Sequence, residues 1–245
     1  MKTIIKTVLA LSVVGCFYAC KQNNVNPEPN AGAINVTNAV INGSAINFFT
    51  NQATFLTTNG NSVSSFGSNF IPVAAGQQQI TLNVPAVPAV PASPGIPATP
   101  ATPAVTYYTG TLSFNANTNY SLFLTGASQS SVDNVLIKET YTRNYADSVC
   151  GVRFIHLATG TNPISVDIAG NANGSEVSSL AYKAYSSFIK HPANNANQSY
   201  NFEFRDQASG TLLTTYTLTT PFFHNVTLAF AGNAGNYTVV QDNDF

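Results

Sequence analysis

The sequence contains no tryptophan, and only 8% of its residues are Asp, Glu, Lys or Arg. Between Pro29 and Val132 there is no charged residue at all, and this segment also lacks histidine and cysteine. General acid–base catalysis, nucleophilic thiols and ordinary metal binding need side chains of these types. Such chemistry is therefore excluded from most of the first half of the chain.

Positive charge is equally scarce. Apart from Lys2 and Lys6 near the N-terminus, seven Lys and Arg residues stand against ten Asp and Glu, which gives a net charge of −3. This balance provides no basic surface for nucleic acid. We expect no nucleic-acid partner and no cofactor.

The N-terminus has the pattern of an export signal. Lys2 and Lys6 precede an apolar run that ends at Ala19 and is followed at once by polar residues. The run is too short for a membrane-spanning helix, which needs about 20 apolar residues. Cys16 and Cys20 each follow a small residue, and the segment resembles a bacterial lipoprotein signal, in which a cysteine becomes the lipidated first residue.

We predict a lipoprotein signal peptide over residues 1–19, a lipidated Cys20 and a flexible tether over residues 20–32. Cys20 is favoured because the polar tail begins directly after it; Cys16 is the alternative, and an ordinary cleaved signal is another. The mature protein is then anchored in a membrane, with the outer membrane favoured and its periplasmic and surface faces both open. Cys150 is the one remaining cysteine, so no intramolecular disulfide is available.

The rest of the chain has the pattern of short β-strands. Residues 164–168 and 200–205 alternate apolar and polar side chains, as half-buried strands do. The best helical window, residues 177–188, is interrupted by serines. The sequence therefore predicts an all-β fold of the sandwich type.

An internal repeat divides the chain. NYSLFLTG, from Asn119, is echoed by NVTLAFAG, from Asn225, 106 positions later. The segment from Ala33 aligns with that from Gly151 at an offset of 118, which places Asn38 opposite His156. The offset decreases because the first copy carries an insertion.

We therefore predict two tandem antiparallel β-sandwich domains, Ig-like or transthyretin-like, each about 100 residues long. The first covers residues 33–142, the second residues 150–245, and residues 143–149 form a linker.

The insertion is rich in proline. Seven prolines recur at a spacing of three within residues 85–105, where the second copy has the turn QASG between two strands. A polyproline II helix has three residues per turn, so these prolines lie along one edge. Pro94 and Gly95 suit the two central positions of a type II turn. We predict a polyproline hairpin of two arms at a hairpin tip; a ligand for a PxxP-reading domain is the alternative.

The strands VRFIHLATG, PISVDIAG and YTVV resemble the domain-of-unknown-function 4397 family, which is often found in bacterial secreted proteins and lipoproteins. The resemblance covers both repeats, residues 33–141 and 150–245. It implies a β-sandwich and export, and it supplies no catalytic residues.

The second copy holds the ionisable side chains that could carry chemistry. The three histidines have neither metal-ligand spacing nor a nucleophile elbow beside them, so we interpret them as structural or surface residues and predict no catalytic site. These histidines and their potential partners are His156, His191, His224, Asp167, Glu203, Asp206, Cys150 and Ser148.

Other polar positions allow simpler interpretations. Asp242 and Asp244 could ligate calcium, but we interpret them as a solvated tail and predict no metal site. Glu203 and Arg205 share one face of a strand and are predicted to form a solvated pair. Ser148, in Asp-Ser-Val, resembles a periplasmic O-glycosylation motif.

Two classes of function remain. The first is a non-enzymatic, membrane-anchored lipoprotein that acts as an adhesin, spacer or scaffold in the cell envelope. The alternative is a glycan-binding lipoprotein, in which Tyr107, Tyr108 and Asn119 could contact sugars. The absence of tryptophan favours the first class. In the first class the partner would be an unknown envelope protein. In the alternative the partner would be a glycan.

Overall fold

The computed structural model describes residues 31–50, 62–95, 97–140, 148–194, 198–219 and 225–243. All the regular elements in these residues are β-strands. None of the described residues belongs to a helix long and apolar enough to cross a membrane. The first eight strands are β1 (Ala31–Val40), β2 (Ile46–Thr50), β3 (Ser62–Val63), β4 (Gly67–Ala74), β5 (Gly76–Val84), β6 (Val105–Phe114), β7 (Asn119–Ser128) and β8 (Ser131–Lys138). The next eight are β9 (Val149–His156), β10 (Ile164–Ile168), β11 (Val177–Leu180), β12 (Ile189–Pro192), β13 (Ser199–Asp206), β14 (Leu212–Thr219), β15 (Asn225–Asn233) and β16 (Asn236–Asn243).

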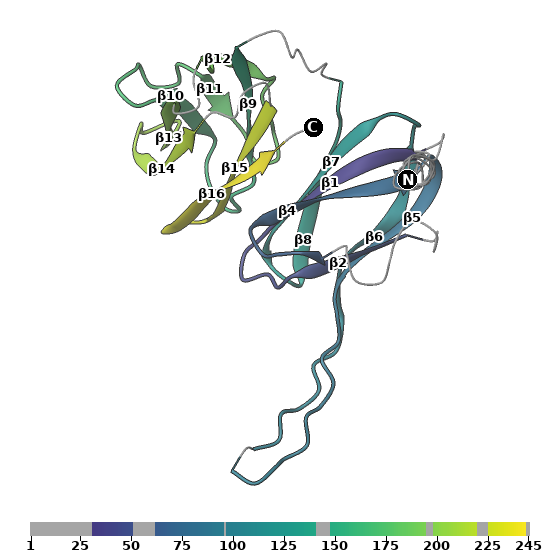
Figure 1. The fold of residues 1–245 in the computed structure, drawn as a ribbon. Helices are drawn as coiled ribbons and strands as arrows, with labels where there is room; N and C mark the ends of the chain where they lie inside the picture. Colours follow the sequence, from purple (N-terminus) through teal and green to yellow (C-terminus); the bar gives the residue numbers. More distant parts are fainter. Residues whose placement is uncertain are drawn as a thin grey trace, which may run out of the picture.

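The strands form two sandwiches of two sheets each (Figure 1). The first contains sheets β4-β1-β7-β8 and β3-β2-β5-β6; the second contains β12-β9-β15-β16 and β11-β10-β13-β14. Each order in the second sandwich equals one in the first with every strand number raised by eight. The predicted all-β fold of tandem sandwiches is confirmed.

Two details differ from the sequence-based expectations. The sheets are not purely antiparallel, because β1 pairs with β7, and β9 with β15, in parallel. β1 begins at Ala31, two residues before the expected start of the first sandwich at residue 33. The window that came closest to a helical pattern, residues 177–188, begins with strand β11 and contains no helix, as expected.

Each sandwich has its own apolar core, produced by the alternation of side chains along the strands. In β2, Phe48 is 2% exposed while the next residue, Phe49, is 45% exposed. In the second sandwich Phe202 and Phe204 are fully buried and make edge-to-face contacts with Phe154, at centroid distances of 5.1 and 6.0 Å. Each such ring contributes about 1.5–3 kcal/mol through burial.

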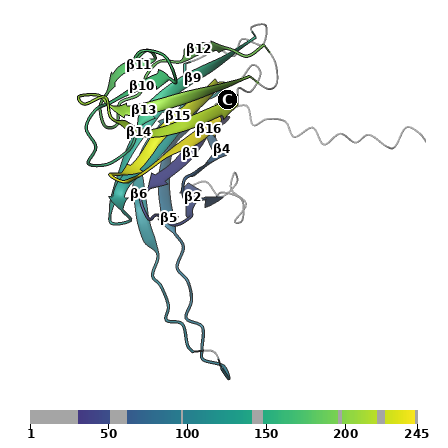
Figure 2. The same cartoon turned by 90° about the vertical axis from the view of Figure 1, so that its left-hand side faces the viewer.

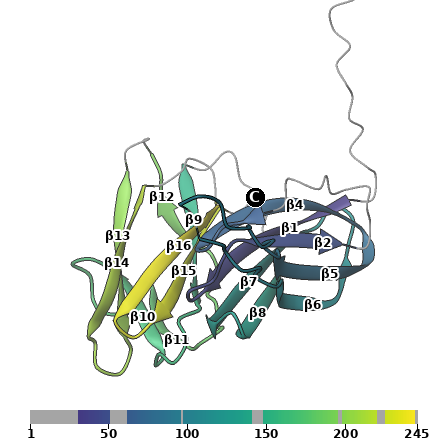
Figure 3. The ribbon, with the colours of Figure 1, turned by 90° about the horizontal axis from the view of Figure 1, so that it is seen from below.

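The two sandwiches are joined along a buried seam. Nearly all residues of β1 and β9 are buried, because one face of each strand fills its own core and the other face packs against the opposite sandwich. β15 contacts β1 and β7, and β16 contacts β4 (Figure 3). The apolar residues of this seam are Ala39, Phe123, Ile137, Ile155, Leu157, Ala229, Ala231 and Val240.

The proline-rich insertion forms a narrow hairpin, the proline finger (residues 85–104), that extends away from both sandwiches (Figures 1 and 2). Val87 and Thr102 exchange two backbone hydrogen bonds of 2.9 Å, and Val90 and Thr99 exchange two of 2.9 and 3.0 Å. Gly95 has φ +81°, as the third residue of a type II turn requires. The predicted hairpin is confirmed. Its cross-arm hydrogen bonds recur at every third residue, in step with the spacing of the prolines.

Because every described residue of the finger is exposed, its removal should spare the fold. Replacement of residues 85–104 by the second copy's turn, Gln-Ala-Ser-Gly, should change the midpoint of thermal unfolding by less than about 5 °C. The core substitution Phe48→Ala is the comparison, with an expected loss of about 3–5 kcal/mol. Failure of the fingerless chain to fold would mean that the finger packs against the sandwich.

Asn38 and His156 occupy equivalent positions at a corner of the two copies and make the same pair of hydrogen bonds there with different side chains. Each accepts a hydrogen bond from the backbone amide two residues later, at 3.4 Å for Asn38 and 3.2 Å for His156. Each also meets the carbonyl oxygen six residues later, at 3.0 and 3.2 Å. Since Nδ1 of His156 accepts, the neutral ring carries its proton on Nε2 and donates it to Asn162. Burial lowers the pKa of His156, although this hydrogen bond partly offsets the effect.

His156→Asn should therefore destabilise the protein less than His156→Ala, which leaves two backbone groups without partners at about 1–3 kcal/mol each. The pKa of His156 is lower in the folded chain than its ordinary value of 6.5, so the unfolded chain binds the proton more readily. Wild-type stability should fall as the pH decreases below about 6.5, and the fall should be smaller in His156→Asn. Urea titrations at several pH values measure both effects. Equal losses of unfolding free energy in the two variants would contradict the inference that Asn and His make equivalent hydrogen bonds at this position.

Candidate functional site

Two hollows lined by described residues lie at the seam. The Arg153 cleft, of about 270 Å³, is lined by Ile137, Lys138, Glu139, Thr140, Arg153, Tyr185, Ser186, Ser187 and Phe188. The seam groove, of about 600 Å³, is lined by Ile41, Asn42, Phe66, Gly232, Asn233, Asn236, Tyr237 and Thr238. Both have walls from both sandwiches, so either can exist only while the sandwiches keep their relative position.

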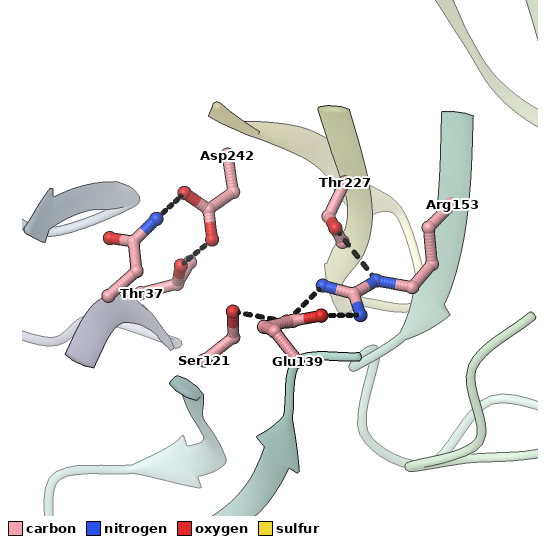
Figure 4. Close-up of polar contacts among 7 residues, drawn as sticks. Thr37, Ser121, Glu139, Arg153, Thr227 and Asp242 are labelled. Atoms are coloured by element: carbon pink, nitrogen blue, oxygen red, sulfur yellow. Dashed lines mark hydrogen bonds and ion pairs between the residues drawn. The ribbon is translucent and has the colours of Figure 1, made fainter. Parts of the chain in front are cut away.

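A buried ion pair fixes that position (Figure 4). Arg153 of β9 donates from Nη1 and Nη2 to the two carboxylate oxygens of Glu139, at 2.9 and 2.8 Å, and from Nε to Thr227 at 2.9 Å. Ser121 donates to the same carboxylate at 2.6 Å. The two charged side chains are only 3% and 4% exposed. Because this bidentate pair and Ser121 engage both oxygens of the carboxylate, the Arg153 cleft is better suited to hold the sandwiches together than to bind a ligand.

Asp242 makes a second polar contact across the seam (Figure 4). Its carboxylate accepts hydrogen bonds from Asn35 and, at 3.0 Å, from Thr37, and its side chain is fully buried. Burial raises the pKa of Asp242, against the effect of these hydrogen bonds. The interpretation as a solvated tail is wrong for Asp242, because β16 continues through it into the seam; Asp244 lies outside the described residues.

Cys150, His191 and Glu176 come together inside the second sandwich. Cys150 lies opposite His191 on the neighbouring strand, and His191 Nε2 is 3.3 Å from a carboxylate oxygen of Glu176. Burial raises the pKa of the Cys150 thiol to about 11 and lowers the pKa of His191. The thiol therefore stays protonated and is a weak nucleophile. His224 lies outside the described residues, within which no group of three His, Cys, Asp or Glu could hold a metal ion.

Glu203 and Arg205 form an ion pair, at 2.5 Å, in which both side chains are partly exposed, and the pair extends to a third, buried residue. Asp167, on the neighbouring strand β10, lies 3.5 Å from Arg205 Nε and is almost fully buried. Burial raises the pKa of Asp167. Asp206 is the last residue of β13, the strand that holds Glu203 and Arg205, and accepts a hydrogen bond from Asn162 at 3.0 Å. These residues stabilise one sheet and its adjoining turns.

The tyrosines expected to contact sugars serve the first core instead. Tyr107 is 6% exposed, and its hydroxyl accepts a hydrogen bond from the Ser44 amide at 3.1 Å. Tyr108 packs against the same core, and burial raises the pKa of both tyrosines. Asn119 is half-buried at the start of β7. The structure therefore does not bring these three residues together as a site.

The seam groove instead presents side chains that the sequence analysis missed. Phe66 is 38% exposed and has φ +50°, and Asn42 has φ +53°. A left-handed backbone is unusual for a bulky aromatic residue, and such strain often accompanies functional positions. The amide of Phe66 donates to the Asn38 carbonyl at 2.8 Å, which helps to hold the ring at the groove.

The opposite wall is the turn between β15 and β16. Tyr237 packs on Phe230 at a centroid distance of 5.0 Å, so its ring is supported from behind. Gly232 has φ +101°, and a Cβ there would lie 2.1 Å from the Asn236 carbonyl oxygen. Only glycine fits this turn. It carries Asn233 and Asn236, both exposed.

The polar groups of the groove are amides and hydroxyls. In the part of the chain that the structure describes, the side chains of Asn42, Asn233 and Asn236 make no hydrogen bond, so their donors and acceptors face solvent. No lining residue is charged. The groove can therefore bind an uncharged ligand that offers apolar surface to the rings and hydrogen-bonding groups to the amides.

One sequence signal could have pointed to this site. After the shared glycine, the first copy continues ASQSSV and the second continues NAGNYT, so asparagine and tyrosine are concentrated in one turn. The other wall comes from Ile41, Asn42 and Phe66, far away in the chain, and only the seam brings the two walls together.

A comparison with curated proteins gives no match. Among solved structures, the chain is similar to the CBM26-family module CBMbc of Eubacterium rectale Amy13K, solved in complex with maltoheptaose: 13% identity, 85% of this chain and 95% of that chain covered, TM-score 0.26. It is also similar to a streptococcal virulence factor described by its α-glucan binding: 14% identity, 86% and 95% covered, TM-score 0.27. Identities and TM-scores this low support no statement about function.

The profile of one protein family matches residues 32–167, a segment that spans the first sandwich and continues into β10 of the second. The matched segment is more than half of the chain, which therefore belongs to the family described as Domain of unknown function (DUF4397).

Proposed function

We propose that this protein is a non-enzymatic lipoprotein of the cell envelope that binds an uncharged glycan in the seam groove. The observation that carries the proposal is the lining of the groove. It combines the rings of Phe66 and Tyr237 with the amides of Asn42, Asn233 and Asn236.

These side chains match the surface of a sugar. A pyranose ring has apolar C–H faces, which pack on aromatic rings, and hydroxyl groups, which both donate and accept. Side-chain amides also do both. A volume of about 600 Å³ lies within the usual range for ligand sites. Without a cation in the lining, the groove should discriminate against sulfated, phosphorylated or uronic sugars, because a buried anion would be unpaired.

The seam supports binding by keeping the two walls at a fixed separation. A ligand that meets a preformed groove avoids much of the cost of ordering loops. The buried Arg153–Glu139 pair and the contacts of Asp242 provide this rigidity.

The positions of the ionisable residues favour binding without turnover. Cys150, His156 and His191 are buried, and none of them lines the groove. Each already has a structural role in the second sandwich.

Phe66→Ala should weaken glycan binding by roughly tenfold, because it removes one stacking ring. An array of neutral and anionic glycans, with maltoheptaose included, identifies the ligand for the soluble form (residues 21–245). Isothermal titration with that ligand then compares wild type with the variant. Neutral glycans are expected to bind and anionic ones to be rejected.

Phe49→Ala is the matched control, since Phe49 is a similarly exposed phenylalanine, 45% against 38%, that does not line the groove. It should leave the affinity unchanged. Absence of any glycan ligand would refute the proposal. Equal affinity of wild type and Phe66→Ala would place the glycan elsewhere.

Membrane anchoring through Cys20 is part of the proposal; Cys16 and Cys20 lie outside the described residues. Cys20→Ser should abolish incorporation of labelled fatty acid and release the protein from the membrane fraction, because two or more acyl chains make a durable anchor. Retained label would move the anchor to Cys16, whereas an unlabelled wild type would exclude a lipoprotein.

Ser148, exposed at the start of the second sandwich, remains the proposed O-glycosylation site, which mass spectrometry of the native protein and Ser148→Ala would test.

A further inference from the structure

We propose that the proline finger of one copy of this protein binds in the seam groove of a second copy. The contact joins two different surfaces, so it links copies head to tail. It concerns the groove proposed to bind glycans, but it does not depend on glycan binding.

The backbone of the finger determines what can bind it. Each arm repeats the triplet Pro-Ala-X, and the X residues Val87, Val90, Thr99 and Thr102 make the hydrogen bonds between the arms. The intervening Pro and Ala carbonyls have no partner within the described finger, and their residues are exposed. The outer surface therefore presents apolar proline rings beside free carbonyl oxygens.

This combination limits the possible partners. Insertion into lipid is disfavoured, because each carbonyl without a partner costs several kcal/mol in hydrocarbon. A charged surface offers no advantage, because the finger contains no charged residue. Polyproline II segments are commonly bound by grooves lined with aromatic rings, and side-chain N–H or O–H donors can satisfy their carbonyls.

The seam groove has this composition. Phe66 and Tyr237 supply the rings, and Asn42, Asn233 and Asn236 supply amide donors that have no intramolecular partner among the described residues. The Arg153 cleft fits less well, because it is smaller and contains the charge of Lys138.

The groove that a finger fills belongs to another copy. The finger extends away from both sandwiches (Figures 1 and 2), and its bridges join its two arms to each other. Such heterologous contacts form open chains, or rings if the rotation closes. A contact of one finger edge is small, so the affinity of a single contact should be in the micromolar range or weaker.

Sedimentation velocity tests the proposal on the soluble form (residues 21–245). From about 1 μM to about 1 mM, the range in which weak contacts dissociate, the average mass of wild type should rise with concentration. Two variants should stay monomeric: the fingerless chain, with residues 85–104 replaced by Gln-Ala-Ser-Gly, and Phe66→Ala. Asn236→Asp, which adds a charge to an exposed turn, is a second groove variant in case Phe66→Ala is unstable.

Mixing provides the decisive measurement. The fingerless chain keeps its groove and Phe66→Ala keeps its finger, so the two together should form a one-to-one dimer and nothing larger. Phe49→Ala is the control and should assemble like wild type. A monomeric wild type, assembly of the fingerless chain, or no dimer in the mixture would each overturn the proposal. Neutral glycan should compete with assembly only if the groove also binds glycan, so the two proposals can fail separately.

Discussion

The structure depends on a charge pair that lies where water is excluded. Arg153 and Glu139 are almost completely buried, so each has lost its hydration, and only the bidentate geometry and the added bonds from Thr227 and Ser121 offset that cost. Loss of one member of such a pair typically destabilises a protein by about 3–5 kcal/mol, because the other charge is left buried. The pair therefore specifies one arrangement of the two sandwiches. Both hollows at the seam follow from this arrangement.

The two copies share a topology but divide the chemistry between them. The first copy has no charged residue until Asp133, whereas the second provides Arg153 and Asp242 for the seam. At one corner the same pair of hydrogen bonds is made by Asn38 in the first copy and by His156 in the second. Equivalent backbones thus tolerate different side chains where the hydrogen-bond pattern is kept. This explains the presence of a histidine at position 156, where it makes the hydrogen bonds of this corner.

Alternation, repeats and proline spacing are local properties, and they allowed the sandwiches and the finger to be predicted. The seam was missed, although the continuous burial of β9 has a trace in the nearly unbroken apolar run around Phe154, which is typical of strands buried on both faces. Asp242 was misassigned because proximity to the chain end suggested solvent. The turn from Asn233 to Thr238 has a signal in its asparagines and tyrosine, but the complete groove could not be derived, since Phe66 and Tyr237 meet only after the sandwiches pack together.

The scarcity of charge has a physical consequence for the finger and the groove. Both surfaces are uncharged, so a finger and a groove that approach each other would meet little electrostatic repulsion, with little dependence on salt. A sugar and a polyproline arm also make similar demands on a groove, namely flat apolar contact and hydrogen-bond donors, without a counter-charge. One lining of rings and amides therefore suits both proposed ligands, and the balance between them would depend on their affinities and local concentrations. In the two proposals, occupation by a glycan and assembly of copies are therefore alternative states of the same groove.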